Sequence, residues 1–414
     1  MARIVVTGGG VAGLSAAARL AKLRHEVVLV EAADVLGGRL RPHAVGDGTW
    51  HLTPPTFTMP GTVRDLFRKS GRPLERVLEI TPVGPRRHVF DDRSVLDLPH
   101  APRSAQHDAL VAALGADDWS AWVDGWADVW DVVRRRTLDV LPDPDALDRG
   151  DRRALGGRRD LARQVRRGLR DRRLRALVLD PVRLGGEDPR WVPVAEAMWP
   201  YVERSFDRWI PAGGTEALAD ALAARLQERR VDVRTGVRAL DVTGSAGAFE
   251  VATDHGPLGA DVVVWCHGPV PDVPGGGLLP RIPAHRTLVR LGPDAPDLPR
   301  EVLAHSDPPM QLWRDDDRLT IAHQNPEDPL VALVRVGIDL RPHVVERHDL
   351  SPAQLVSLGH WGWQWMGRGT RFDRPSRLRE GLYVAGAHAH PGPTIELILS
   401  ATAAIADDVG PAPR

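Results

Sequence analysis

Both ends of the chain combine short β-branched runs with stretches of helical spacing. Residues 4–6 form a continuous apolar run, residues 14–21 place apolar side chains on one helical face, and residues 27–30 form a second run. Such runs are typical of strands that are buried on both faces of a parallel sheet. Near the other end, residues 381–387 predict a strand that enters a glycine turn, and residues 395–404 predict a helix. The pattern therefore predicts an α/β fold with a βαβ unit at the N-terminus.

The turn between the first run and the first helix carries the spacing G-x-G-x-x-G, formed by Gly8, Gly10 and Gly13. Gly8 permits the tight turn, Gly10 lets the backbone approach a diphosphate, and Gly13 permits close packing of the helix on the sheet. The free N–H groups of the helix attract the anion. Glu31 ends the second run and can accept hydrogen bonds from ribose hydroxyls. We predict a dinucleotide site, and the acid disfavours the 2′-phosphate of NADP.

A second glycine pair, Gly37 and Gly38, follows the acid directly and precedes Arg39. It brings another loop to the diphosphate, which Arg39 can neutralise, and this favours FAD over NAD. At the C-terminal end, Gly386 marks a tight turn and Thr394 is the expected N-cap of a helix that begins at Ile395. A helix that begins there would direct its N–H groups at the pyrimidine edge of a flavin.

Composition narrows the class of protein further. The 414 residues suggest two lobes, 43% apolar residues are typical of a globular protein, and a net charge of −1 gives no general attraction to nucleic acid. The single cysteine, Cys266, excludes an internal disulfide framework and a C-x-x-C redox pair, and with no cysteine expected near the flavin ring we predict non-covalent FAD. We see no signal peptide and no stretch of 18 apolar residues, so the expected location is the cytoplasm.

The segment 4–39 resembles the FAD fingerprint of the amine oxidase and phytoene (carotenoid) desaturase superfamily, and segments 50–60, 211–218 and 381–404 are similar to its desaturase-like branch. The resemblance implies a Rossmann-like FAD-binding domain of the glutathione-reductase type, with a parallel sheet and a β-meander. It also implies a discontinuous mixed α+β substrate domain, and it places the backbone of Ala239 at the adenine. We expect the FAD-binding domain in 1–80, 205–268 and 370–414, and the substrate domain in 81–204 and 269–369.

Several positions depart from the family pattern. His51 and Thr53 replace an Asp and a Gly near the flavin, residues 393–396 replace a Gly-x-Gly-x-Pro segment, and Arg24 replaces a Gly before the second strand. The first two departures mean that the substrate is not necessarily a long polyene. The Arg24 change is expected to affect the turn alone.

Two further segments have alternative interpretations. Trp361, Trp363 and Trp365 alternate as on one face of a strand and either line a substrate pocket or pack in a core. The tryptophans at 119, 122, 126 and 130 form one stripe on a helix, which favours core packing over a pocket wall. Residues 149–175 are rich in arginine and form either a solvated helix, which we favour, or a basic amphipathic helix on an anionic membrane surface.

The leading functional hypothesis is an FAD-dependent oxidoreductase that dehydrogenates an apolar small molecule by hydride transfer to flavin N5, with oxygen or a quinone as the possible acceptor. His51, His388 and His390 are the candidate catalytic residues, although structural roles are an equal alternative. A flavin amine oxidase is one alternative function. A redox-neutral isomerase or cyclase, or a non-catalytic flavin-binding protein, is another. No metal site is expected.

Overall fold

The computed structural model describes residues 1–115, 118–156, 159–268, 270, 278–324, 327–360, 362–365 and 376–413. For residues 144, 278–280 and 362–365 only the backbone is described.

A six-stranded sheet contains both predicted β-branched runs at its centre. Val5 of the first run pairs with Val28 on one side and Val263 on the other, both in parallel register. All three valines are at most 2% exposed, as expected for strands covered on both faces. In spatial order the strands are β21 (Arg377–Arg379), β22 (Leu382–Val384), β13 (Val262–Trp265), β1 (Arg3–Thr7), β2 (Glu26–Glu31) and β9 (Asp232–Thr235), and β21 alone is antiparallel.

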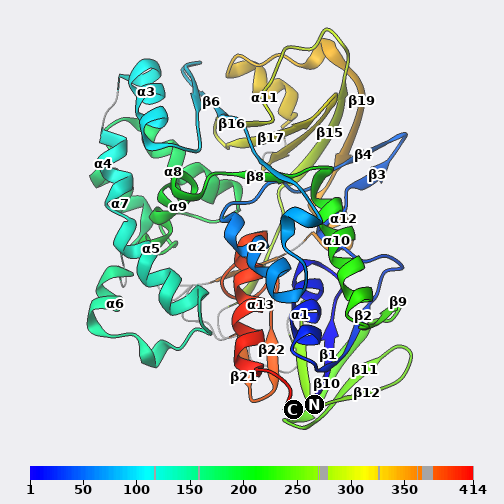
Figure 1. Cartoon of the computed structure of the whole chain (residues 1–414). Helices are drawn as coiled ribbons and strands as arrows, with labels where there is room; N and C mark the ends of the chain where they lie inside the picture. The colour runs from blue at the N-terminus through cyan, green and yellow to red at the C-terminus, as the bar shows by residue number, and fades with distance from the viewer. Residues whose placement is uncertain are drawn as a thin grey trace.

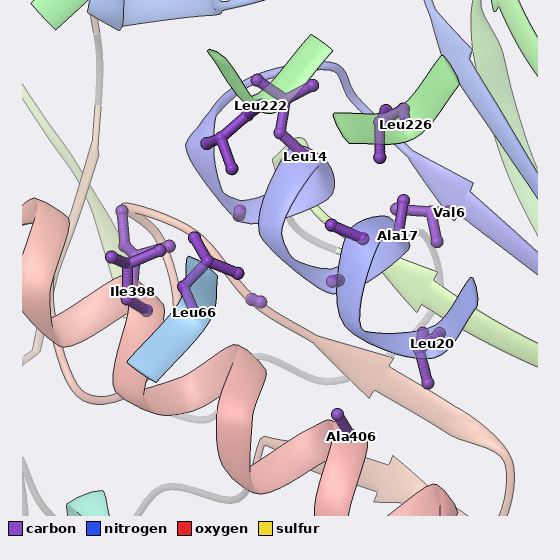
Figure 2. Close-up of a cluster of buried hydrophobic side chains, with 14 of the residues drawn as sticks. Val6, Leu14, Ala17, Leu20, Leu66, Leu222, Leu226, Ile398 and Ala406 are labelled. Carbon is purple, nitrogen blue, oxygen red and sulfur yellow. The ribbon is translucent and has the colours of Figure 1, made fainter. Parts of the chain in front are cut away.

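Four helices form the largest apolar core with this sheet: α1 (Val11–Lys22), α2 (Pro60–Ser70), α10 (Gly214–Glu228) and α13 (Ile395–Val409). Figure 2 shows Leu14 of α1 facing Leu222 and Leu226 of α10, while Ile398 of α13 lies beside Leu66 of α2. A buried hydrogen bond of 2.9 Å between Ser15 Oγ and Thr402 Oγ1 also joins α1 to α13. The C-terminal helix is therefore packed directly against the first helix of the chain.

The remaining strands build antiparallel and mixed sheets. A three-stranded meander consists of β10 (Ala239–Ser245), β11 (Ala248–Thr253) and β12 (Leu258–Ala260). A seven-stranded sheet has the order β19 (Val344–Leu350), β15 (His285–Leu291), β18 (Arg318–His323), β17 (Met310–Asp315), β16 (Glu301–His305), β6 (Arg86–Phe90) and β7 (Val95–Leu98). Three strand pairs complete the set: β3 (His43–Val45) with β4 (Gly48–Trp50), β5 (Ile80–Pro82) with β8 (Trp209–Pro211), and β14 (Leu278–Arg281) with β20 (Gly362–Trp365).

A second group of helices lies on one side of the molecule (Figure 1). It contains α3 (Arg103–Leu114), α4 (Asp118–Asp124), α5 (Ala127–Val133), α6 (Arg149–Ala154), α7 (Leu161–Gly168), α8 (Arg172–Leu184) and α9 (Trp199–Phe206), whereas α11 (Pro329–Arg335) and α12 (Pro352–Ser357) lie near the seven-stranded sheet.

The tryptophan stripe lies on two helices instead of the predicted one. The helix is interrupted at Gly125 and Trp126, where the Trp126 backbone leaves helical geometry (φ −101°, ψ 1°). Three members of the stripe still pack together, because the rings of Trp119 and Trp122 stack and Trp122 meets Trp126 in a T-shaped contact. These residues join one apolar cluster with α7 and α8, so core packing is what the structure shows.

The arginine-rich segment is also divided, into α6, α7 and the first turn of α8. Its apolar line is formed by Leu161, Val165 and Leu169, which are at most 1% exposed. The continuous amphipathic helix that we considered is therefore wrong, because each apolar side chain already faces the protein interior.

The two ends of the chain lie side by side (Figure 1), with Ala412 N donating to Leu23 O over 2.9 Å. The six-stranded sheet and the meander are formed by strands from 1–80, 205–268 and 370–414, and the seven-stranded sheet is formed by strands from 81–204 and 269–369. The division into two lobes remains a prediction. The architecture itself is the predicted mixed α/β fold with a parallel sheet and a β-meander.

Candidate functional site

Turns from both ends of the chain meet at the carboxyl edge of the parallel sheet. The neighbouring strands β1, β13 and β22 end at Thr7, Trp265 and Val384. A Cβ added to Gly8 would lie 3.3 Å from His267 Cβ, and one added to Gly386 would lie 3.2 Å from the Cys266 carbonyl. Both turns therefore contact the residues that follow β13. In the sheet, β2 and β9 lie on one side of β1, whereas β13, β22 and β21 lie on the other side. The strand order thus changes direction at β1, and open α/β sheets bind their ligands at such a switch point.

The two N-terminal glycine motifs are in direct contact. Gly37 N donates to Gly9 O over 2.8 Å, and a Cβ on Gly38 would lie 3.2 Å from Gly10 Cα. A Cβ on Gly13 would lie 1.8 Å from the Gly8 carbonyl oxygen, so this position requires glycine. At Gly10, by contrast, no described atom lies within 4 Å of the added Cβ. The packing around Gly13 is filled, and space is left above Gly10, where the sequence predicts the diphosphate.

Glu31 connects this turn to the end of β2. One carboxylate oxygen accepts a short hydrogen bond from Gly9 N, and the other accepts one of 2.8 Å from Ala33 N. Gly10 is the N-cap of α1, and no described side chain caps this helix end. The first-turn N–H groups of α1 therefore provide an anion site, next to a carboxylate that is fixed by the backbone.

Arg39 supplies positive charge beside the glycine motifs. No hydrogen bond or ion pair joins it to another described residue, and burial together with the neighbouring Arg281 lowers its pKa to about 10. A guanidinium group remains protonated in proteins, so Arg39 needs a counter-ion. The open space at Gly10, the uncapped helix and Arg39 together fit the diphosphate of FAD.

His267 connects Ala239 to Thr7 at the carboxyl edge of the parallel sheet. His267 places Nε2 3.2 Å from Ala239 O and Nδ1 3.0 Å from Thr7 Oγ1. Ala239 is 7% exposed and begins β10, immediately after the turn that follows β9. The predicted adenine contact therefore lies on the same edge as the glycine turn.

The C-terminal motif approaches from the other side of β13. Gly386 has φ +126°, and α13 begins at Ile395, as predicted. Thr394 occupies the N-cap position, but its hydroxyl makes no capping bond to the described backbone. The first-turn Glu396 carboxyl accepts hydrogen bonds from its own backbone N–H and from the Thr394 side chain, so it takes up part of the positive end of α13.

The two histidines of this motif differ in environment. Burial, with a smaller contribution from His267, lowers the pKa of His388 to about 3, so its ring is neutral near pH 7. His390 is 2% exposed and its Nε2 lies 2.9 Å from Thr137 O, which ties the motif to the segment that follows α5.

His51 lies on a different element from the other two histidines. Its Nε2 is 3.3 Å from Glu216 Oε2, in the first turn of α10. Its carbonyl accepts hydrogen bonds from Trp313 Nε1 (2.8 Å) and Thr320 Oγ1 (3.0 Å). The structure thus fixes His51 between α10 and the seven-stranded sheet.

The predicted tryptophan pocket cannot be placed. Trp361 lies outside the described residues. Trp363 and Trp365 belong to β20, which pairs with β14, and their side chains are outside the described part of the chain.

Sequence reasoning missed three residues of the site: Arg281, Arg286 and His360. Burial and Arg281 lower the pKa of Arg39, and burial together with both of these arginines lowers the pKa of Arg286. Burial, together with Arg39 and Arg286, lowers the pKa of His360 to about 3. No motif marks these residues, since Arg281 and Arg286 belong to strands of ordinary composition. Glu396, in the first turn of α13, is 4% exposed, and burial raises its pKa. Its position matches the role of a helix first-turn acid.

Among the described residues, no group of three or more His, Cys, Asp and Glu side chains could hold a metal ion. A search of the same residues finds no helix with the length and apolarity needed to cross a bilayer.

Comparison with known proteins identifies the family of this chain. Residues 11–269, more than half of the chain, match the family described as flavin containing amine oxidoreductase. A 4,4'-diapolycopene oxygenase of Methylomonas sp is 25% identical over 80% of this chain and 71% of its own length. A phytoene dehydrogenase of Streptomyces griseus is 31% identical over 70% of this chain, although the match spans 59% of the relative. A structure of putrescine oxidase superposes with a TM-score of 0.68 over 99% of this chain and 98% of that chain, at 13% identity, and thus shares the fold. The chain belongs to the FAD-dependent flavin-containing amine oxidoreductase family, with named relatives among its carotenoid desaturases.

Proposed function

We propose that this protein dehydrogenates a lipophilic small molecule and that non-covalently bound FAD accepts the hydride at N5. The observation that carries the proposal is the meeting of the N-terminal and C-terminal glycine turns at Cys266 and His267, on one edge of the parallel sheet. The names of the carotenoid relatives support an apolar substrate. Oxygen or a quinone is the proposed final acceptor.

Each part of the site has a separate task in this proposal. Gly10 and the first turn of α1 bind the diphosphate, Glu31 receives the ribose hydroxyls, and Ala239 contacts the adenine. The first turn of α13, from Thr394 and Ile395, stabilises negative charge at the pyrimidine edge. Bound FAD supplies the hydride acceptor.

The histidines are assigned different roles. His388 is neutral at pH 7 and is therefore proposed as a hydrogen-bonding group, because a pKa of about 3 makes it a poor proton acceptor. His390 orients the C-terminal motif through Thr137. His51, held by Glu216, is the proposed proton-transfer group for substrates that lose an acidic proton with the hydride.

Substitution of Gly10 tests the cofactor site. Gly10 has an extended backbone (φ −76°, ψ −174°) that valine adopts readily, and the added side chain meets no described atom within 4 Å of its Cβ. Gly10→Val should therefore fold but fill the space of the diphosphate, so FAD affinity should fall at least about 100-fold. Gly61→Val is the matched control, because Gly61 is exposed on α2 and its added Cβ is equally free of described neighbours.

FAD titration of the two apoproteins, with circular dichroism as the folding check, measures the difference. A folded Gly10→Val protein that binds FAD like the control would contradict the assignment of the site. Acid should also release the flavin from the wild-type chain, and flavin that remained on the denatured chain would exclude non-covalent binding.

Anaerobic mixing with phytoene, oleate and putrescine separates the possible reactions. Bleaching of the oxidised flavin band by a lipophilic compound supports dehydrogenation. Bleaching by putrescine alone would favour an amine oxidase, and product without net bleaching would favour redox-neutral catalysis.

A further inference from the structure

A cavity of about 630 Å³ lies between α7, α8 and the turn that follows α8, within the second group of helices in Figure 1. Helix α8 contributes Arg172, Arg175 and Arg183, whose spacing places them on one face of the helix. Helix α7 contributes Arg166, and an adjoining hollow of about 400 Å³ shares Arg166 and Arg190 with the cavity. The two helices therefore turn basic faces toward one shared space.

The other faces of these two helices are packed in the protein interior. Leu161 and Val165 of α7 and Leu174 and Val178 of α8 belong to one apolar cluster and are at most 5% exposed. Burial of these side chains fixes the rotation of both helices. The arginines on the opposite faces are therefore held around the cavity by the packing of the core.

Three of the lining arginines already have carboxylate partners: Arg172 pairs with Asp91 and Asp92, Arg183 with Asp180, and Arg190 with Asp188. Arg166 and Arg175 pair with no carboxylate in the described part of the chain. Arg166 Nε donates to Ala162 O over 3.3 Å, and Arg175 Nε donates to Leu169 O over 2.8 Å. Both bonds use Nε, so the two terminal nitrogens of each guanidinium group remain as donors.

The lining also holds more positive charge than its own acids offset. Arg163 and Arg167, in the adjoining hollow, form no ion pair with a described carboxylate either. Against these two and the pair in the cavity, the described lining offers two further acids, Asp160 and Glu187. Two positive charges remain even when both acids are counted in full. Arg163 lies three and four residues before Arg166 and Arg167, and like charges at these spacings destabilise a helix, so a bound anion would relieve the repulsion.

We propose that this cavity binds a phosphate monoester through Arg166 and Arg175. The group carries about two negative charges near neutral pH, which matches two guanidinium groups, and its paired oxygens fit their planar ends. The volume lies within the range of small-molecule sites, about 300 to 1,000 Å³. A small soluble compound and the head group of a lipid can both present this group. The inference goes beyond the proposed function and does not depend on it.

The test uses the FAD-loaded protein and titration calorimetry with glycerol 3-phosphate and dimethyl phosphate. At pH 8, about two units above its second pKa, the monoester carries two charges, whereas the diester carries one. The wild type should bind the monoester at least about 10-fold more tightly than the diester, as expected for an added hydrogen bond to a charged group. Equal affinity for the two probes would overturn the inference.

Paired substitutions test the two arginines. Arg166→Gln with Arg175→Gln should weaken binding of the monoester at least about 10-fold, and Arg166→Lys with Arg175→Lys, which keeps the charges, should retain part of it. The matched control is Arg149→Gln with Arg153→Gln, because both arginines are exposed on α6 and line neither hollow. The control changes the net charge equally and should bind like the wild type. Equal weakening by the control would show attraction by the whole basic segment and would contradict a built site.

A second arm separates the two sources of the phosphate group. Binding of glycerol 3-phosphate with the expected preference assigns the site to a soluble phosphate ester. Binding only to phosphatidylcholine vesicles that contain phosphatidic acid, lost in Arg166→Gln with Arg175→Gln, assigns it to a lipid head group. If the wild type bound neither probe, the inference would be wrong.

Discussion

At the scale of single residues, the turn before β2 contains a strained arginine. Arg24 has φ +69°, a left-handed conformation that costs a residue with a Cβ about 1 kcal/mol. Glycine adopts this conformation freely but loses more entropy on folding. We expect Arg24→Gly to raise the free energy of unfolding by about 0.5 kcal/mol in urea titrations. Arg24→Ala, which keeps the Cβ, should give no gain, and an equal gain for alanine would contradict the explanation by strain.

A second residue-scale prediction concerns His388 and acid. Its pKa is about 3 in the folded state, mainly because of burial, against about 6.5 in the unfolded chain. The stability that the neutral ring contributes is present above pH 6.5 and is lost as the pH falls toward 3. Between pH 7 and pH 5 this loss should reach about 2 kcal/mol.

Urea unfolding of His388→Gln should therefore show about 2 kcal/mol less acid destabilisation than the wild type over this range. His255→Gln is the control, since the His255 side chain is 65% exposed. Equal pH dependence of wild type and His388→Gln would mean that His388 titrates normally.

Glycines that a tight turn requires could be predicted from the sequence. Charged residues that influence one another across the fold could not. Gly8 and Gly13 have local requirements that their spacing reveals: Gly8 has φ +90°, and a Cβ on Gly13 would lie 1.8 Å from the Gly8 carbonyl oxygen. The pKa of Arg286, by contrast, is lowered by burial and in part by Arg39, which is far away in the sequence. Only the fold brings these charges together, so no local pattern could indicate them.

At the scale of elements, an ion-pair network joins β6, β16 and the start of β8. Glu301, 1% exposed on β16, pairs with Arg208 (2.8 Å) and with Arg86 of β6 (3.0 Å), and it accepts a hydrogen bond of 2.7 Å from Thr56 Oγ1. Burial alone would raise the pKa of Glu301, but Arg208 and Arg86 hold it at about 2. Both arginines also pair with Glu203, Arg86 over 2.9 Å and Arg208 over 3.7 Å, so removal of the Glu301 carboxylate would leave two buried guanidinium groups with one carboxylate in place of two.

We expect Glu301→Gln to lower the free energy of unfolding by about 3 kcal/mol at pH 7. The depressed pKa means that this contribution is present above the unfolded value near 4.5 and is lost as the pH falls toward 2, so the difference from wild type should shrink in acid. Chemical denaturation at pH 7 and pH 4 measures it, with the exposed Glu250→Gln as control. A loss below about 1 kcal/mol at pH 7 would show that the network contributes little.

The arginine-rich segment 149–175, which we expected to form one helix, is divided into three helices, and an aspartate precedes each of them. Asp148, Asp160 and Asp171 are the N-caps of α6, α7 and α8, and each accepts a backbone hydrogen bond of the helix that it begins. Asp148 and Asp171 also pair with arginines, with Arg136 over 3.8 Å and with Arg173 over 2.7 Å. An acid before each helical stretch is equally a start signal, and capping is the role that the structure shows.

At the scale of the whole molecule, the parallel sheet was predictable and the seven-stranded sheet was not. The strands β1 and β2 are adjacent in sequence and flank a recognised turn. The other sheet pairs β6 with β16 in parallel register, and the whole second group of helices, α3 to α9, lies between these strands in the sequence. Such long-range pairing depends on the packing of the complete chain, and no local pattern specifies it.

The near-neutral chain also carries a strongly basic face. A cavity of about 630 Å³ between α7 and α8 is lined by arginines that include Arg166, Arg175 and Arg190, and Arg163 and Arg167 lie in the adjoining hollow. The apolar side chains of this segment are buried, so it has no apolar line to insert into a bilayer. Any contact with a membrane should therefore be electrostatic.

We accordingly expect weak, salt-sensitive binding to phosphatidylserine vesicles and no binding to neutral phosphatidylcholine vesicles in sedimentation assays. Each arginine near an anionic surface contributes about 1 kcal/mol, so Arg163→Gln with Arg167→Gln should weaken binding about tenfold or more. Arg68→Gln on α2 is the control, because this exposed arginine lies outside the basic face. Screening should abolish the interaction at about 0.5 M salt. Binding that survived this salt would require apolar insertion, which the burial of Leu161, Val165 and Leu169 does not allow.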